Sequence, residues 1–432
     1  MDSSAPLPAR SRQWLDRAAR VLVALLPTLA TVALYLPKGA LMPSRLAVLA
    51  LLALGVGSVW IRRRLDAPRT AATTIMVFGV MLGFGALSWA RFPEPDLAAF
   101  SHAAFIAAAA LATALTVVRL PMLHVLVAGW AVSAALAAAI GYWEVVTGSH
   151  LPGNLPAQKY DDVIPGWNVI SSFFDNPNLY GYHCAVVLVL LPLAYQLAQG
   201  WLRPGVIVLG VLVSGALYWS SSRMGLVAAV VGLVVWALTR RWSVIVMLLS
   251  AVTVGVTALA GWPPGRTIAY HVRQLTENLQ WGELTSSGSR LQLIRTGWWM
   301  TGESGYLGVG PGHFATWAAS PNNPYPSGLV NPHSGVVEVM AEYGLISLAT
   351  LGVGALAAVL LCVRALARLP MEASAARASA WCSIALVASL PFVSHTHSSW
   401  LSQPLTMVHI ATITGLLAFV ESATRELIRV EN

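Results

Sequence analysis

Charged residues are scarce in this chain. Of its 432 residues only 10% are Asp, Glu, Lys or Arg, whereas 56% are hydrophobic and the mean hydropathy is +0.67. Soluble globular domains carry roughly 25% charged residues, so the composition excludes an ordinary soluble enzyme. The sequence instead predicts an all-α polytopic membrane protein.

Cysteine is also rare. Cys184, Cys362 and Cys382 are the three cysteines, and each falls within an apolar run without the spacing typical of metal ligands. A disulfide framework and a zinc site are therefore both excluded, and we expect these thiols to pack between helices. No cleavable signal peptide is expected, because the first apolar run follows a basic segment and lacks a small-residue cleavage site.

Long apolar runs are the main feature of the sequence. Twelve windows are near the length needed to cross a ~30 Å hydrocarbon core: eleven are about 15 to 25 residues long, and the tenth is longer. The windows cover residues 21–36, 45–61, 71–90, 97–118, 122–146, 177–199, 205–219, 224–239, 243–260, 334–363, 379–395 and 404–421. We therefore expect about twelve transmembrane helices.

The spacing of these windows divides the chain into three parts. Residues 1–261 hold the first nine spans, with an outer loop at 147–177. Residues 262–333 form a large polar outer loop with interfacial helices, and residues 334–432 hold the last three spans and a cytoplasmic tail. The large loop is the longest polar interval of the chain and ends where the tenth span begins.

The net charge of +8 does not indicate nucleic-acid binding, because the basic residues are scattered over short loops rather than gathered on one face. A cytoplasmic N-terminus followed by twelve spans places most of the 26 lysines and arginines on the inner side. Both termini are then cytoplasmic, and membrane lipids are the expected surroundings. The basic residues left on the outer side need a separate explanation.

Two of these outer arginines are candidates for binding an anion. Arg223 follows Ser222 at the start of the eighth span, where a cation close to hydrocarbon needs a partner. Local carboxylates are few, so a ligand phosphate is favoured. Arg290 is predicted to lie in the first turn of a helix, where backbone N–H groups also favour an anion. Neighbouring Arg295 is expected to face solvent.

His333 is the candidate base. It lies where the large loop meets the tenth span, and an ordinary histidine pKa of about 6.5 allows it to accept a proton at neutral pH. Glu338 and Glu342 follow on the same span and either orient groups at the site or face a polar interior. Asn178, at the start of the sixth span, contacts a sugar or phosphate or merely belongs to a helix cap.

Other motifs have simpler interpretations. Residues 308–312 are rich in glycine but lack the strand and the Lys-Ser/Thr of a nucleotide loop, so a tight turn is expected. The pair Glu94 and Asp96 could hold a divalent metal, but a solvated turn is favoured. His395 and His397 are expected to belong to a polar turn at the membrane boundary rather than to a metal site.

Taken together, the order of these motifs resembles the O-antigen ligase and polymerase superfamily. The motifs are Phe174-Asp-Asn-Pro-Asn178, Ser222-Arg-Met-Gly225, Gly288-Ser-Arg290, Gly308-Val-Gly-Pro-Gly312 and His333-Ser-Gly-x-x-Glu338-x-x-Ala-Glu342-Tyr-Gly344. The resemblance covers roughly residues 172–348. The commoner pattern has Asn after the histidine, where this chain has Ser334.

The resemblance implies a lipid-dependent glycosyltransferase of the bacterial inner membrane, GT-C-like in architecture, with its active site on the periplasmic face. Such an enzyme moves O-antigen polysaccharide from undecaprenyl diphosphate to lipid A-core lipopolysaccharide, with inversion and without metal or cofactor. By residue, it implies Arg223 and Arg290 at the diphosphate and His333 as the catalytic group. Further candidate substrate contacts are Asn178, Ser222, Ser334 and Glu338.

Three alternatives stay open at this point. An O-antigen polymerase uses the same donor with a lipid-linked glycan as acceptor, and a protein O-oligosaccharyltransferase uses a protein. The ligase is favoured because only two spans follow the tenth and no large C-terminal periplasmic domain is evident. A polysaccharide-lipid transporter is disfavoured, because its charges would lie near the bilayer midplane.

Overall fold

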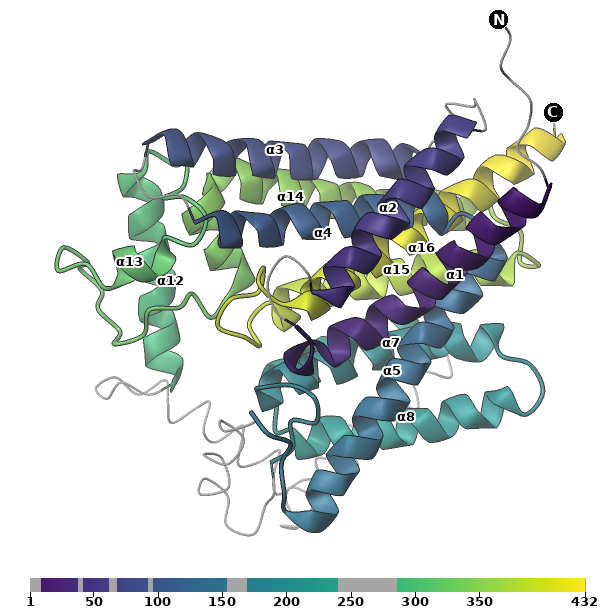
Figure 1. The fold of residues 1–432 in the computed structure, drawn as a ribbon, viewed down its shortest axis with the longest axis horizontal. Helices are drawn as coiled ribbons and strands as arrows, with labels where there is room; N and C mark the ends of the chain where they lie inside the picture. The colour runs from purple at the N-terminus through teal and green to yellow at the C-terminus, as the bar shows by residue number, and fades with distance from the viewer. Residues whose placement is uncertain are drawn as a thin grey trace, which may run out of the picture.

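The computed structural model describes residues 9–37, 42–61, 68–91, 96–153, 169–239 and 286–431. These residues form a helical bundle (Figure 1). Its elements are α1 (Ala9–Thr31), η1 (Ala33–Tyr35), α2 (Pro43–Ile61), α3 (Arg69–Arg91), α4 (Leu97–Thr116), α5 (Leu120–Thr147), α7 (Pro177–Leu197), α8 (Leu202–Trp219), α9 (Arg223–Ala237), α12 (Ser286–Glu303), α13 (Phe314–Ala318), α14 (Gly335–Arg368), α15 (Ser374–Val393) and α16 (Pro404–Glu431).

The apolar windows of the sequence correspond to these helices. Eight helices of the described chain are long and apolar enough to cross a membrane, and α2 and α9 are shorter apolar helices. The prediction of an all-helical polytopic membrane protein is thus confirmed. Window 243–260 lies outside the described residues, so the number of twelve spans stays a prediction.

Two predicted boundaries are wrong. The first window was expected to be helical to residue 36, but α1 ends at Thr31 and Ala33–Tyr35 form a 3-10 turn. Leu36 is extended because the ring of Pro37 disfavours helical geometry in the residue before it. The tenth window was expected to be one helix, but α14 is broken at Gly344.

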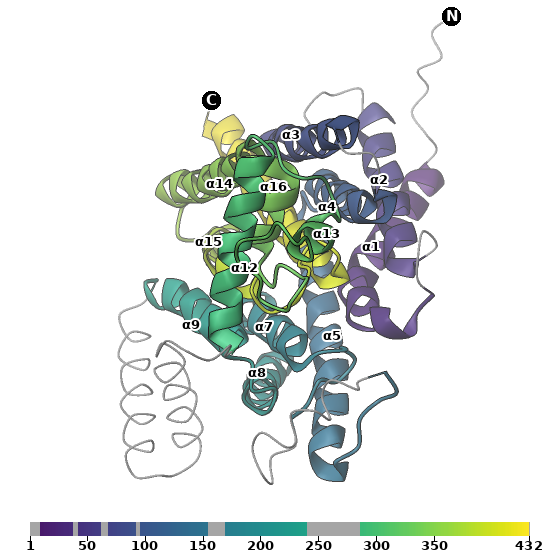
Figure 2. The same ribbon diagram turned by 90° about the vertical axis from the view of Figure 1, so that its left-hand side faces the viewer.

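The long helices run side by side, and α12 and α13 lie across one end of them (Figures 1 and 2). We call this end, which also carries the 394–403 loop between α15 and α16, the α12 end. The start of α1 and the end of α16 lie at the opposite end (Figure 1). The side of the membrane on which each terminus lies stays a prediction.

Helices α7 and α16 form the centre of the bundle, since most of each is covered by other helices. Polar side chains bridge the central helices. The hydroxyls of Thr31 and Ser133 are 2.7 Å apart, Ser133 is 2.9 Å from His183 Nε2, and Trp130 Nε1 donates to Thr412 Oγ1 at 2.8 Å. In lipid such bonds join helices at about 1 kcal/mol or less each, so close packing of the apolar faces carries much of the cohesion.

The break in α14 is filled by the glycine-rich turn at 308–312. Gly344 has φ 87°, which interrupts the helix. The carbonyls of Ala341 and Glu342 accept hydrogen bonds from the N–H groups of Val309 (2.8 Å) and Gly310 (3.0 Å). Backbone groups at membrane depth need such partners, because lipid offers none. The predicted tight turn is therefore confirmed, and its role is to complete a broken helix.

Gly308→Ala is expected to destabilise the protein. Gly308 has φ 89°, and a Cβ there would lie 2.5 Å from the carbonyl oxygen of Glu342. A left-handed conformation alone costs a residue other than glycine about 1–2 kcal/mol, and the backbone contact adds to this. Thermal unfolding in detergent should show a lower midpoint for Gly308→Ala.

The matched control is Gly302→Ala, because a Cβ at this position of α12 meets nothing within 4 Å. Alanine is also the better helix former by about 1 kcal/mol. An equal loss of stability in both variants would contradict the proposed contact of the turn with α14.

Candidate active site

His333 lies at the α12 end, immediately before α14, in a strained backbone conformation. Its φ is 47°, and its N–H donates to the carbonyl of Ser398 at 3.0 Å. Residues other than glycine in this region are uncommon and cluster at functional sites. Ser334 begins the helix: its buried hydroxyl accepts from the N–H of Val337. The structure therefore gives Ser334 the role of a cap, and the predicted substrate contact stays a prediction.

The surroundings of His333 keep its imidazole neutral. Burial, the positive charge of Arg290 and the neighbouring His397 together lower the pKa of His333 to about 4. All three disfavour the imidazolium form. His333 is thus neutral at pH 7 and able to accept a proton. The two residues come from different elements, α12 and the start of α14, so the structure brings together a predicted base and a predicted cation.

The expected location of Arg290 needs correction. Arg290 was predicted in the first turn of its helix, but α12 begins at Ser286, so Arg290 follows the first turn. The polar run of serines before it is itself helical. The free N–H groups at the start of α12 therefore precede Arg290 in the chain, and the side-chain charge of Arg290 is what reaches the site.

The loop between α15 and α16 contributes two histidines. Burial and the positive charge of Arg290 lower the pKa of His395. His397 Nδ1 lies 2.9 Å from Gln403 Nε2, and its Nε2 is 3.8 Å from Asp175 Oδ1. Sequence reasoning treated these histidines only as a polar turn. These histidines lie near His333 because the 394–403 loop packs against the start of α14, and no local sequence motif predicts that packing.

Glu338 ties this loop to α14. Its buried carboxylate accepts hydrogen bonds from the hydroxyl of Ser399, from the N–H of Trp400 (2.7 Å) and from the N–H of Leu401 (3.2 Å). A carboxylate that accepts three hydrogen bonds fixes the backbone that donates them. Glu338 thus positions the loop against which His333 rests, and its predicted substrate contact stays a prediction.

Glu342 holds the opposite side in the same way. One turn further along α14, its carboxylate accepts from the N–H of Gly312 (2.9 Å) and of Phe314 (3.2 Å), at the start of α13. The hydrophobic contacts of Leu293 and Met300 on α12 with α14 add to this attachment. The two glutamates therefore fix the segments on both sides of α14.

Arg223, Ser222 and Asn178 form a second group. Arg223 is the first residue of α9 and is half-buried. The Ser222 hydroxyl caps this helix by accepting from Gly225 N (3.2 Å), and it lies 3.4 Å from the carbonyl of Asn178. A Cβ on Gly181 would lie 2.2 Å from that of Ser222, so α7 and α9 cross in close contact. Asn178 is held through its backbone, as expected for a residue of a helix cap.

The two groups share the α12 end. Asp175, which approaches His397, lies just before α7, where Asn178 and Ser222 meet. Among the described residues no hydrogen bond or ion pair joins Arg223 directly to His333. The structure therefore brings His333 and Arg290 together, whereas Arg223 belongs to the second group of residues at the α12 end.

Metal ligation finds no support in the geometry of the described chain, where no three His, Cys, Asp or Glu side chains are arranged to hold an ion. Asp96 caps α4 by accepting from the N–H groups of Ala98 (2.9 Å) and Ala99 (3.0 Å). Glu94 lies outside the described residues. Metal-independent chemistry stays a prediction.

Comparison with known proteins agrees with the motifs. A family model described as O-antigen ligase matches residues 208–352. This segment contains Arg223, Arg290 and His333. A comparison with curated proteins gives no match.

Glu338→Ala is expected to loosen the α15–α16 loop. Three donors lose their acceptor, and each unsatisfied buried donor costs about 1–3 kcal/mol; partial rearrangement of the loop leaves an expected net loss of about 2–4 kcal/mol. Thermal unfolding should show the loss, and hydrogen exchange should accelerate at Trp400 and Leu401. Glu303→Ala, which removes an exposed carboxylate at the end of α12, is the control. Unchanged exchange at Trp400 would contradict the proposed role of Glu338.

Proposed function

We propose that this protein is a lipid-dependent glycosyltransferase acting as an O-antigen ligase. The match of residues 208–352 to the family model described as O-antigen ligase supports this proposal. The donor is a polysaccharide on undecaprenyl diphosphate, and the acceptor is a sugar hydroxyl of lipid A-core lipopolysaccharide. The α12 end faces the periplasm, and both termini face the cytoplasm of an inner-membrane protein.

The observation that carries this proposal is the pairing of His333 with Arg290. A neutral imidazole and a guanidinium from separate elements interact electrostatically at one end of a membrane bundle. A glycosyl diphosphate needs positive charge at its leaving group and a base near the attacking hydroxyl. This pair supplies both, and Arg223 adds a second guanidinium at the α12 end.

The proposed reaction is a direct displacement. The acceptor hydroxyl oxygen forms a bond to the anomeric carbon of the donor sugar, while the bond from that carbon to the diphosphate oxygen breaks and the electron pair leaves with undecaprenyl diphosphate. The hydroxyl proton passes to His333 and then to water. Arg223 and Arg290 stabilise the growing charge on the diphosphate by charge-assisted hydrogen bonds. Attack opposite the leaving group inverts the anomeric centre.

His333→Ala should abolish most of the transfer. Loss of a general base typically slows a reaction about 10²–10⁴-fold. The assay uses purified protein, undecaprenyl-diphosphate-linked glycan and rough lipopolysaccharide, with EDTA present, and follows the formation of glycan attached to lipid A-core. His124→Ala, near the start of α5 at the other end of the bundle, is the control and should retain wild-type transfer.

Two results of this assay would contradict the proposal. If the glycan lengthens on its lipid carrier without transfer to core, the protein is a polymerase instead. If EDTA stops the wild-type reaction and Mg²⁺ restores it, the metal-independent mechanism is wrong.

The pH dependence should differ between free and donor-bound protein. In free protein the pKa of His333 is about 4, so kcat/KM for the donor should stay flat from about pH 8 to pH 5 and fall below that as the imidazole is protonated. Bound diphosphate neutralises Arg290, which removes one cause of the lowered pKa. The acid limb of kcat should therefore lie at higher pH than that of kcat/KM.

Arg290→Gln provides the internal check. Removal of the Arg290 charge should raise the pKa of His333, because that charge opposes the imidazolium. The kcat/KM of this variant should therefore begin to fall at a higher pH than that of the wild type. If the acid limb stays in place in this variant, Arg290 does not act on His333.

A further inference from the structure

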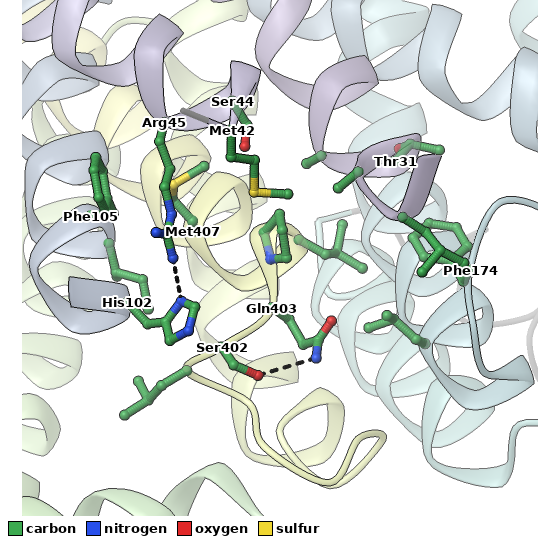
Figure 3. A pocket seen from close by; sticks show the side chains of 18 of the residues that line it. Thr31, Met42, Ser44, Arg45, His102, Phe105, Phe174, Ser402, Gln403 and Met407 are labelled. Atoms are coloured by element: carbon green, nitrogen blue, oxygen red, sulfur yellow. Dashed lines mark hydrogen bonds between the residues drawn. The ribbon is translucent and has the colours of Figure 1, made fainter. Parts of the chain in front are cut away.

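A cavity at the α12 end lies beside the groups described above and includes Asp175 and Leu401 in its lining. It has a volume of about 290 Å³ and lies between α1, α2, α4, the segment before α7 and the start of α16 (Figure 3). Its lining is largely apolar, from side chains such as Phe105 and Met407, with polar groups at a few positions. The important polar groups come from the first turn of α2.

The most prominent of these groups is the guanidinium of Arg45. It reaches from α2 to His102 on α4, where the nitrogen–nitrogen distance is 2.7 Å, and it lies over the ring of Phe105 at 4.7 Å (Figure 3). The imidazole of His102 and the ring of Phe105 hold the guanidinium of Arg45 at the edge of the cavity. A cation beside an apolar cavity at the end of membrane helices favours an anionic ligand.

A second, independent observation points to the same ligand. The hydroxyl of Ser44 lines the cavity, is fully buried, and has no hydrogen-bond partner among the described residues. A buried hydroxyl without a partner costs about 1–3 kcal/mol, so a ligand that bonds to it recovers this loss. Ser44 and Arg45 both belong to the first turn of α2, where the helix dipole also favours negative charge.

The cavity has a negative wall as well. Asp175 lines its far side, where it approaches His397 at 3.8 Å. The two charges come from different segments, with Arg45 at the start of α2 and Asp175 just before α7. A phosphate would therefore occupy the α2 side, beside Ser44 and Arg45.

This cavity adjoins the region of His333. A neighbouring cavity of about 230 Å³ is lined by Asn331 and Pro332, which directly precede His333, and by Glu338. The two cavities share His102, Leu401 and Ser402 in their walls. A molecule anchored beside Arg45 could therefore extend along this shared wall toward the imidazole.

We propose that Ser44 and Arg45 bind a lipid-borne phosphate, and that in the reaction this is a phosphate monoester of the acceptor glycolipid. The inference rests on the proposed function. The donor arginines come from α9 and α12, whereas Arg45 comes from α2, which lies on the opposite side of the bundle from α9 (Figure 2). An inverting displacement needs the attacking hydroxyl and the leaving diphosphate on opposite sides of the anomeric carbon, and two separate anion sites satisfy this requirement.

The test compares Arg45→Gln with wild type in neutral phosphatidylcholine nanodiscs. The acceptor is lipid A-core with its phosphate monoesters intact or removed by phosphatase. Loss of a charge-assisted contact should raise the acceptor KM about ten- to hundredfold for the phosphorylated acceptor, with the donor KM unchanged. The dephosphorylated acceptor should give the same KM with both proteins. Arg45→Lys should restore part of the discrimination.

The control is Arg203→Gln, which removes an arginine that lies over Tyr195 at the other end of the bundle. Ser44→Ala is the second variant: it should raise the acceptor KM in the same direction, and it supplies the test if Arg45→Gln does not fold. A raised donor KM, or an equal loss with both acceptors, would overturn the proposal.

Two further experiments distinguish the acceptor phosphate from a membrane-lipid phosphate, and phosphate binding from the transfer reaction. If added phosphatidylglycerol, rather than the acceptor phosphate, determines the difference between Arg45→Gln and wild type, a membrane lipid occupies the site and the acceptor assignment is wrong. Native mass spectrometry of the nanodisc complexes tests binding without transfer. A preference for the phosphorylated glycolipid that Arg45→Gln removes would support the phosphate site even if the proposed reaction fails, and no preference in wild type would overturn it.

Discussion

The α12 end depends on two carboxylates buried one turn apart in α14. Glu338 binds the 399–401 backbone, and Glu342 binds the backbone at Gly312 and Phe314. A carboxylate buried at the end of a membrane helix is costly unless several donors satisfy it. Here the donors are backbone N–H groups of the two loops that flank the site. The same bonds that satisfy the glutamates therefore fix the walls around His333.

The break at Gly344 makes this arrangement possible. A continuous helix uses its own carbonyls, whereas the interruption frees those of Ala341 and Glu342 for the turn at 308–312. The helix before the break then belongs to the site, and the helix after it belongs to the membrane. Substitutions that straighten α14 would therefore act on His333 without touching it.

The sequence predicted the helices well and the site in part. Apolar length alone indicated nearly every helix in the described chain, and motif order indicated His333, Arg223 and Arg290. The break in α14 was not predictable from hydropathy, because residues 334–363 form one long, mostly apolar window and a glycine is tolerated inside a membrane helix. His397, Asp175 and Arg45 were also missed. The contacts of these residues join segments far apart in the chain, and no local pattern in the sequence indicates such contacts.

Two helices at the α12 end begin with an arginine in the first turn, which is an unfavourable position for a cation. Arg223 opens α9 and Arg45 lies in the first turn of α2, and neither first turn holds an acidic residue. A cation at a helix N-terminus opposes the helix dipole and costs about 0.3–1 kcal/mol, and proximity to hydrocarbon adds to this cost. A bound phosphate reverses the sign of both effects, because it interacts favourably with the dipole and with the guanidinium. Two helices that begin this way at the same end of one bundle are consistent with the anionic ligands proposed above.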